Sequence, residues 1–146
     1  MNNKKGFTLI ELLAVIVILA IIALITTPIV LNLINQSKEA ANKRSVEAYA
    51  KAVEYAVAQY EYDNNGELPT FANISSKIEY SNSDVVCTVE INGDTKGSVE
   101  LCGCKVGSYT NTYYKYSSKK GNKGASKDTV TSALSGTSSA SGTCPE

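Results

Sequence analysis

Lys4-Lys5-Gly6-Phe7-Thr8-Leu9-Ile10-Glu11-Leu12-Leu13 is the stretch that decides the fold of this 146-residue chain. A short basic end precedes an apolar run, in which 14 consecutive apolar residues extend from position 12 to position 25. After a break at 26–28, the apolar character continues to Ile34. About 20 helical residues cross the apolar core of a bilayer, so the segment from Phe7 to roughly Ile29 predicts a membrane-spanning helix. The two lysines favour a cytoplasmic amino terminus.

Glu11 is the one charged residue inside this apolar run. A carboxylate at the centre of a membrane helix costs about 2.5 to 3.5 kcal/mol, and less near the interface. A secretory signal peptide would end a short apolar region at a small-residue cleavage site, which the sequence from Leu24 to Pro28 does not offer. An ordinary membrane anchor fits the length but does not explain the acid. A partner for the Glu11 carboxylate is therefore expected.

The residues from Gly6 to Glu11, the apolar run and Pro28 resemble the class III signal of type IV prepilins. The pseudopilins of type II secretion and the competence pilins carry the same kind of signal. The resemblance implies that a prepilin peptidase cuts after Gly6, removes the leader of residues 1–6 and methylates the new amino terminus at Phe7. It also implies that Glu11 neutralises the amino terminus of a neighbouring subunit when helices leave the membrane for a fibre. Phe7, Glu11 and Pro28 are thus the expected assembly residues.

Physical chemistry supports two of these roles. An unpaired carboxylate in apolar surroundings is costly, so a positive amino terminus from another copy would supply both pairing energy and register to Glu11. Pro28 lies inside the predicted helix and cannot donate a backbone N–H, so a kink or a locally melted turn is expected there.

Composition excludes several classes of function. The 14 basic and 14 acidic residues give a net charge of zero, so the overall charge does not indicate a polyanion as a partner. The chain contains no histidine, which excludes Ser-His-Asp and Cys-His catalysis and every histidine-containing metal site. Paired carboxylates, phosphate-binding loops and activated nucleophiles are not visible in the sequence. We expect a protein that is not an enzyme and that needs neither a cofactor nor a metal.

The predicted organisation has three parts: a leader at 1–6, a transmembrane and fibre-core helix at 7–34, and a globular head at 35–146. The helix is expected to continue into the head as far as about Tyr62, because apolar residues recur there at helical spacing. That stripe consists of Val46, Tyr49, Val53, Ala56 or Val57, and Tyr60. We expect it to pack on the sheet of its own domain. The expected fold is α+β: a pilin fold, as the resemblance implies, with a long amino-terminal helix on a small antiparallel sheet.

The head should form its sheet from segments rich in β-branched and aromatic residues. Residues 84–91 and 98–102 predict a hairpin around a turn at 92–97, and residues 109–116 predict a third strand. A fourth strand is expected at 128–134. The connector at 67–83 is expected to be irregular apart from one short helical turn at 74–78, and the Ser/Gly-rich tail at 135–143 would be disordered if nothing held it.

The four cysteines, Cys87, Cys102, Cys104 and Cys144, all lie beyond the predicted membrane segment. An even number in an exported domain favours two disulfides. Zinc is disfavoured, because Cys102-Gly103-Cys104 lacks the usual spacing and no second close pair exists. Cys102 and Cys104 are too close to pair comfortably with each other. Cys144 should therefore bond one of them and Cys87 the other, and the sequence leaves both pairings open.

The resemblance implies a structural pilin subunit that forms a helical homo-oligomer and serves adhesion, motility or surface attachment. Its expected partners are a prepilin peptidase, an assembly ATPase, a platform protein and the membrane. The expected location is the cytoplasmic membrane as a single-pass precursor and then the extracellular pilus. Alternatives are a minor or competence pilin that binds DNA, a pseudopilin, or an anchored domain that never polymerises. Six lysines and several tyrosines between 101 and 127 have the chemistry of a DNA-binding surface. A polar sheet face with a solvated loop at 119–124 is the favoured interpretation of this segment.

Overall fold

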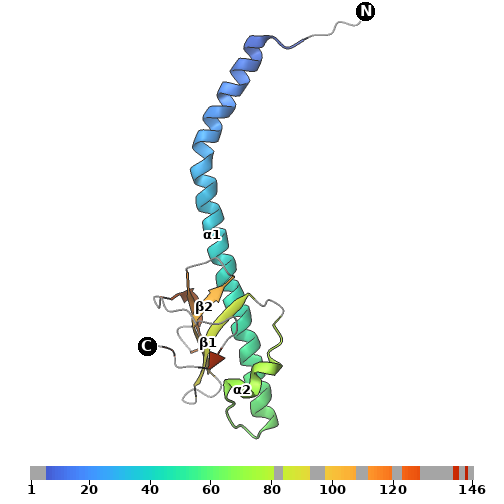
Figure 1. Cartoon of the computed structure of the whole chain (residues 1–146), viewed down its shortest axis with the longest axis vertical. Helices are drawn as coiled ribbons and strands as arrows, with labels where there is room; N and C mark the ends of the chain where they lie inside the picture. Colours follow the sequence, from blue (N-terminus) through green and yellow to red (C-terminus); the bar gives the residue numbers. More distant parts are fainter. Residues whose placement is uncertain are drawn as a thin grey trace, which may run out of the picture. The chain divides into compact units, whose positions relative to one another are not determined.

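The computed structural model describes residues 6–80, 84–92, 98–107, 112–119, 123–128, 140–141 and 144. Within these ranges the chain forms a long helix, a short helix and strands (Figure 1). The elements are α1 (Leu9–Asp63), α2 (Phe71–Ile74), a 3-10 turn (Ser75–Lys77), β1 (Val85–Asn92), β2 (Ser98–Val106), β3 (Tyr114–Ser117), β4 (Gly124–Lys127) and β5 (Ala140–Ser141). The chain divides into two compact units, residues 1–39 and residues 40–146.

In the first unit, α1 is an apolar helix whose side chains are all exposed from Leu9 to Lys38. Among the described residues, α1 is the one helix long and apolar enough to cross a membrane. Its helical structure continues through Pro28, so of the two expectations for this position, a kink or a locally melted turn, the melted turn is excluded. The two threonine hydroxyls just before the proline bond to the backbone of their own helix. Thr26 donates to the Ile22 carbonyl at 3.0 Å, and Thr27 donates to the Ala23 carbonyl at 2.7 Å. These bonds keep two polar groups paired in a segment that water cannot reach once it lies in a membrane.

The second unit has one hydrophobic core, formed where the later half of α1 packs on one face of the sheet. The predicted helical stripe is confirmed: Val46, Tyr49, Val53, Ala56 and Val57 are buried, and Tyr60 packs at the edge of the core. Alternate residues of the strands meet this stripe, as the two-residue period of a strand requires. They are Val85, Cys87, Val89, Val99, Leu101, Cys104, Tyr114 and Tyr116. The predicted α+β arrangement of a long helix on a small antiparallel sheet is therefore confirmed.

Polar groups at the edge of the core also join helix to sheet. The Tyr116 hydroxyl donates to Glu54 Oε1 at 2.8 Å, and the Ala125 N–H donates to Glu47 Oε1 at 3.3 Å. The Tyr114 hydroxyl accepts a hydrogen bond from the Asn42 side chain at 3.2 Å. Burial raises the pKa of Tyr116, and the neighbouring Glu54 carboxylate raises it further. Tyr116 therefore stays a neutral hydrogen-bond donor at any physiological pH.

The strand order is β4-β3-β2-β1-β5, with β5 parallel to β1 and the other neighbours antiparallel. The two strands of the predicted hairpin are confirmed with shifted ends: β1 includes Asn92, and β2 extends past Cys102 to Val106. Residues 93–97 of the predicted turn lie outside the described ranges. β3 overlaps the end of the third predicted strand and extends one residue past it to Ser117, and residues 109–111 of that prediction are outside the described ranges. β4 occupies 124–127, just before the fourth predicted strand, and residues 129–134 are also outside the described ranges. Gly124, expected at the end of a solvated loop, instead pairs with Ser117.

Gly103 forms a bulge in β2 that changes the direction of the side chains after it. Thr88 pairs with Cys102 and Val86 with Lys105, so one extra residue of β2 lies between these two pairs. Gly103 has a φ of 57°, the left-handed region that glycine adopts without strain, and this is the backbone of a glycine bulge. Its N–H, turned out of the ladder, donates to Asp128 Oδ2 at 2.9 Å. As a result, Cys104 faces the helix and Cys102 does not, although two residues apart in a regular strand share a face.

We predict that Tyr116→Phe destabilises the second unit by about 1.5 to 3 kcal/mol, because it removes a hydrogen bond to a charged acceptor. Tyr55→Phe, at an exposed site on the same helix, is the matched control and should change stability by less than about 0.5 kcal/mol. The measurement is urea unfolding of the full chain in detergent, followed by circular dichroism. Equal midpoints for the two variants would contradict the role given to the bond between Tyr116 and Glu54.

Candidate processing and assembly site

The expected cleavage junction lies in open chain immediately before α1. Gly6, Phe7 and Thr8 are not helical, and a Cβ placed on Gly6 would meet nothing within 4 Å. The Phe7 side chain is 87% exposed. The expected junction therefore lies outside the helix. Residues 1–5 of the expected leader lie outside the described ranges.

Glu11 and Thr8 form a reciprocal cap at the first turn of α1. The Thr8 N–H donates to Glu11 Oε2 at 2.9 Å, and the Thr8 hydroxyl donates to the same oxygen at 2.8 Å. In return, the Glu11 N–H donates to the Thr8 hydroxyl oxygen at 3.4 Å. This arrangement is a capping box, in which residue N-cap and residue N3 satisfy each other's unpaired donors. We did not predict this capping box, although Thr8-Leu9-Ile10-Glu11 has the spacing that signals one.

The cap gives Glu11 a function within a single chain and leaves it able to take a second partner. A carboxylate accepts at both oxygens, and among the described residues the hydrogen bonds to this side chain involve Oε2 alone. The carboxylate also lies at the positive end of the helix dipole, which favours its charged form. One oxygen is therefore held by Thr8, and Oε1 remains as an acceptor for a donor from outside the chain.

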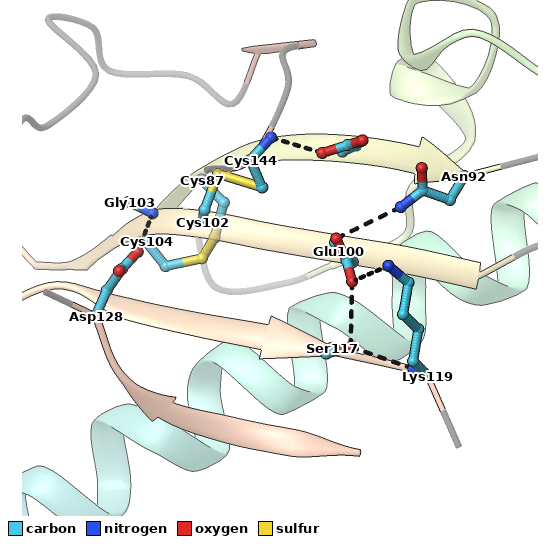
Figure 2. Close-up of a disulfide and its surroundings, with 11 residues drawn as sticks. Cys87, Asn92, Glu100, Cys102, Gly103, Cys104, Ser117, Lys119, Asp128 and Cys144 are labelled. Carbon is cyan, nitrogen blue, oxygen red and sulfur yellow. Dashed lines mark hydrogen bonds and ion pairs between the residues drawn. A yellow bond between two sulfur atoms is a disulfide. The ribbon is translucent and has the colours of Figure 1, made fainter. Parts of the chain in front are cut away.

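Both expected disulfides are present, and the structure selects one of the two pairings left open by the sequence (Figure 2). Cys87 is bonded to Cys104, and Cys102 is bonded to Cys144. The bulge at Gly103 decides between the pairings. Cys104 faces the helix together with buried Cys87, whereas Cys102 faces the opposite side of the sheet, where Cys144 arrives.

The tail is attached to the sheet by more than its disulfide. β5, two residues of the predicted disordered stretch, pairs with β1 at Thr88 and Val89. The Cys144 N–H donates to Glu90 Oε2 at 2.6 Å. Glu90 lies directly opposite Glu100 in the hairpin. Like charges facing each other across strands are unfavourable, so the donor from the tail offsets part of that repulsion.

The negative charge of Glu100 is also partly compensated, by donors on the other side of its carboxylate. Figure 2 shows Asn92, Ser117 and Lys119 directed at its carboxylate. The Lys119 Nζ lies 3.0 Å from Glu100 Oε1. The face of the sheet away from α1 is thus a network of paired polar groups that includes the end of the chain.

Two of the four tyrosines in the alternative lysine and tyrosine surface for DNA cannot contact a nucleic acid. Tyr114 and Tyr116 are buried against α1, so neither ring can stack on a base. Tyr109 and Lys120 lie outside the described residues. No group of three or more cysteine and acidic side chains that could hold a metal occurs in the described part of the chain.

Comparison with known proteins agrees with the amino-terminal site. Residues 1–27 match the family model for the prokaryotic N-terminal methylation motif. Competence protein ComGC of Bacillus subtilis is 34% identical over 85 residues, which cover 58% of this chain and 82% of that protein. The chain belongs to the type IV pilin-like proteins. No solved structure matches this pilin-like chain.

Other relatives of the pilin-like chain come from different systems. The type IV wide pilus major component PilA4 of Thermus thermophilus is 35% identical over 111 residues, covering 68% of this chain and 80% of that protein. The type II secretion system core protein G of Escherichia coli is 33% identical over 78 residues, covering 53% of this chain and 51% of that protein. Similarity at this level is shared among pilins, competence proteins and secretion proteins.

We predict that Cys144→Ser leaves the bond between Cys87 and Cys104 intact and frees the Cys102 thiol alone. In the chain-entropy account, the 42-residue separation makes the lost bond worth about 4 kcal/mol, compared with about 3 kcal/mol for the 17-residue one. Mass spectrometry of alkylated peptides would identify the free thiol. Alkylation of Cys104 in place of Cys102 would contradict the connectivity.

Proposed function

We propose that this pilin-like chain is the structural subunit of a type IV pilus fibre, assembled from the membrane through its amino-terminal helix. The observation that carries the proposal is the apolar segment of α1, whose side chains are all exposed. This segment begins at Glu11, whose carboxylate caps the helix, and it follows the junction within the N-terminal methylation motif. An apolar helix of that length is stable in water only when something covers it. Lipid covers it before assembly, and the same segment of other copies covers it in the fibre.

The energetics favour a homo-oligomer. Removing a Leu, Ile or Val side chain from water contributes about 1.5 to 3 kcal/mol, and the segment from Phe7 to Leu33 is made chiefly of such residues. The gain on passing from lipid to neighbouring helices is much smaller, because both surroundings are apolar. The transfer of the helix from lipid into the fibre must therefore be driven by close helix packing, by charge pairing at Glu11 and by an external energy source.

That requirement sets the proposed partners. A prepilin peptidase removes residues 1–6 and methylates Phe7, and an assembly ATPase with its platform protein moves the subunit from the cytoplasmic membrane into the extracellular fibre. The chain is a substrate of these proteins and catalyses no reaction itself. Adhesion, twitching motility or surface attachment would be properties of the completed fibre.

A second candidate function is a subunit of a DNA-uptake fibre. The names of two relatives favour it: competence protein ComGC of Bacillus subtilis, and a ComG operon protein 3 homolog of Bacillus licheniformis, which is 33% identical over 75 residues. Direct DNA binding by Tyr114 and Tyr116 is disfavoured by their burial. Deleting the gene separates the two functions: loss of transformation with surface motility retained would favour the second, and the reverse result the first.

We predict that the mature protein begins at Phe7, carries one added methyl group and is four hydrogen masses lighter than the reduced chain because it holds two disulfides. Intact mass and amino-terminal sequencing measure all three. Gly6→Leu replaces the small residue before the cleavage site with a bulky one, and it is expected to leave residues 1–6 in place. A wild-type protein that kept its first six residues would end the proposal.

We also predict that Glu11→Ala inserts into the membrane normally but reaches sheared surface fibres in much smaller amount. Glu11→Gln is the more informative variant, because its amide oxygen can still accept from Thr8 and keep the cap while the charge is lost. Incorporation of Glu11→Gln at the level of Glu11→Ala would show that charge matters. Wild-type levels of both variants in the fibre would refute the pairing role.

A further inference from the structure

The later half of α1 has a second face, which the sheet does not cover. Seven residues recur on it at alternating spacings of three and four, and all are exposed: Ala41, Arg44, Ala48, Lys51, Tyr55, Ala58 and Tyr62. We call this set the α1 seam. Its two tyrosines are 71% and 88% exposed, and they are the large hydrophobic residues exposed among the described residues of this unit. A face with this spacing is what a helix presents to another helix.

Charge is divided along the α1 seam. Arg44 and Lys51 lie in its first half, and no ion pair recorded within the described ranges involves either of them. The nearby carboxylates of Glu47 and Glu54 are directed to the sheet side, where Glu47 accepts from the Ala125 N–H and Glu54 from the Tyr116 hydroxyl. The first half of the seam is therefore basic.

The far end of the seam is acidic. Asp63 and Glu67 are exposed there, and the sequence holds no lysine or arginine between Lys51 and Lys77. Lys77 offsets Asp63 in part, at 3.8 Å, with both side chains about half exposed. Glu67 follows the end of the helix and adds a second negative charge.

We propose that the α1 seam is a contact with a second copy of this chain, parallel to the first and displaced along the helix by about 14 residues, or roughly 21 Å. This inference rests on the proposed function, which places all copies in one orientation in the membrane. In a parallel pair without displacement, Arg44 and Lys51 would each face their own counterparts, which is unfavourable. A displacement brings the basic half of one copy beside the acidic end of the next.

The sizes of the side chains select the amount of displacement. Tyr62 and Ala48 are separated by 14 positions, as are Tyr55 and Ala41. At that displacement each tyrosine of one copy lies against an alanine of the other, so that large meets small along the seam. The same displacement sets Lys51 of one copy at the level between Asp63 and Glu67 of its neighbour. Packing and charge thus give the same register.

Cysteine cross-linking in sheared fibres tests this register. The native cysteines are all in disulfides, so Ala48→Cys with Tyr62→Cys adds two thiols, which lie about 21 Å apart in one helix and cannot bond within a chain. Mild oxidation should give a ladder of covalent multimers. The pair Ala41→Cys with Tyr55→Cys should do the same, so the test does not depend on one variant folding.

The controls identify what would overturn the inference. Dimers from Ala48→Cys alone would indicate a parallel contact without displacement, and fibres of both double variants without any ladder would show that the seam is not a contact. Tyr62→Cys with Lys115→Cys, the latter on the exposed side of β3, should stay monomeric under oxidation. If the wild-type chain forms no fibre, the proposed function fails. If fibres form and give no ladder, this inference alone fails.

Discussion

The packing of the buried stripe of α1 against one face of the sheet is the interaction on which the rest of the head depends. Val46, Val53 and Val57 are completely or almost completely buried there, in one core with Leu101 and Tyr114. Because a helix offers only one face to a sheet, the same contact determines which residues stay exposed. The orientation of α1 about its own axis therefore determines both the core of the head and the α1 seam.

The bulge at Gly103 is the second constraint, and it acts on the covalent structure. Without an extra residue, Cys102 and Cys104 would lie on one face and compete for the same partners. With it, one disulfide closes the core at Cys87 and the other fastens the tail across the opposite face. The tail then supplies a backbone donor to Glu90 and a strand to the edge of β1. An edge covered in this way is less open to pairing with other chains.

The sequence was informative where a periodic pattern agreed with the final packing, and uninformative where tertiary contacts decided. The stripe from Val46 to Tyr60 and the strand at 84–91 were predicted from period and composition alone. β4 was not, because Gly124-Ala125-Ser126-Lys127 has no preference for strand structure and forms one only by pairing with β3. The disulfide pairing depended on a left-handed glycine inside a strand. No propensity scale reports that conformation.

The cap at Thr8 and Glu11 shows how one carboxylate can serve both a monomer and a fibre. The atoms that hold it, the N–H and the hydroxyl of Thr8, lie on the carboxyl side of the bond between Gly6 and Phe7. Cleavage there would leave the cap intact and create a positive charge next to it. That charge can approach its own Glu11 or another copy's, because Thr8 occupies only one oxygen of the side chain among the described residues. The cap is compatible with either partner, and the choice between them is left to the packing of the helices.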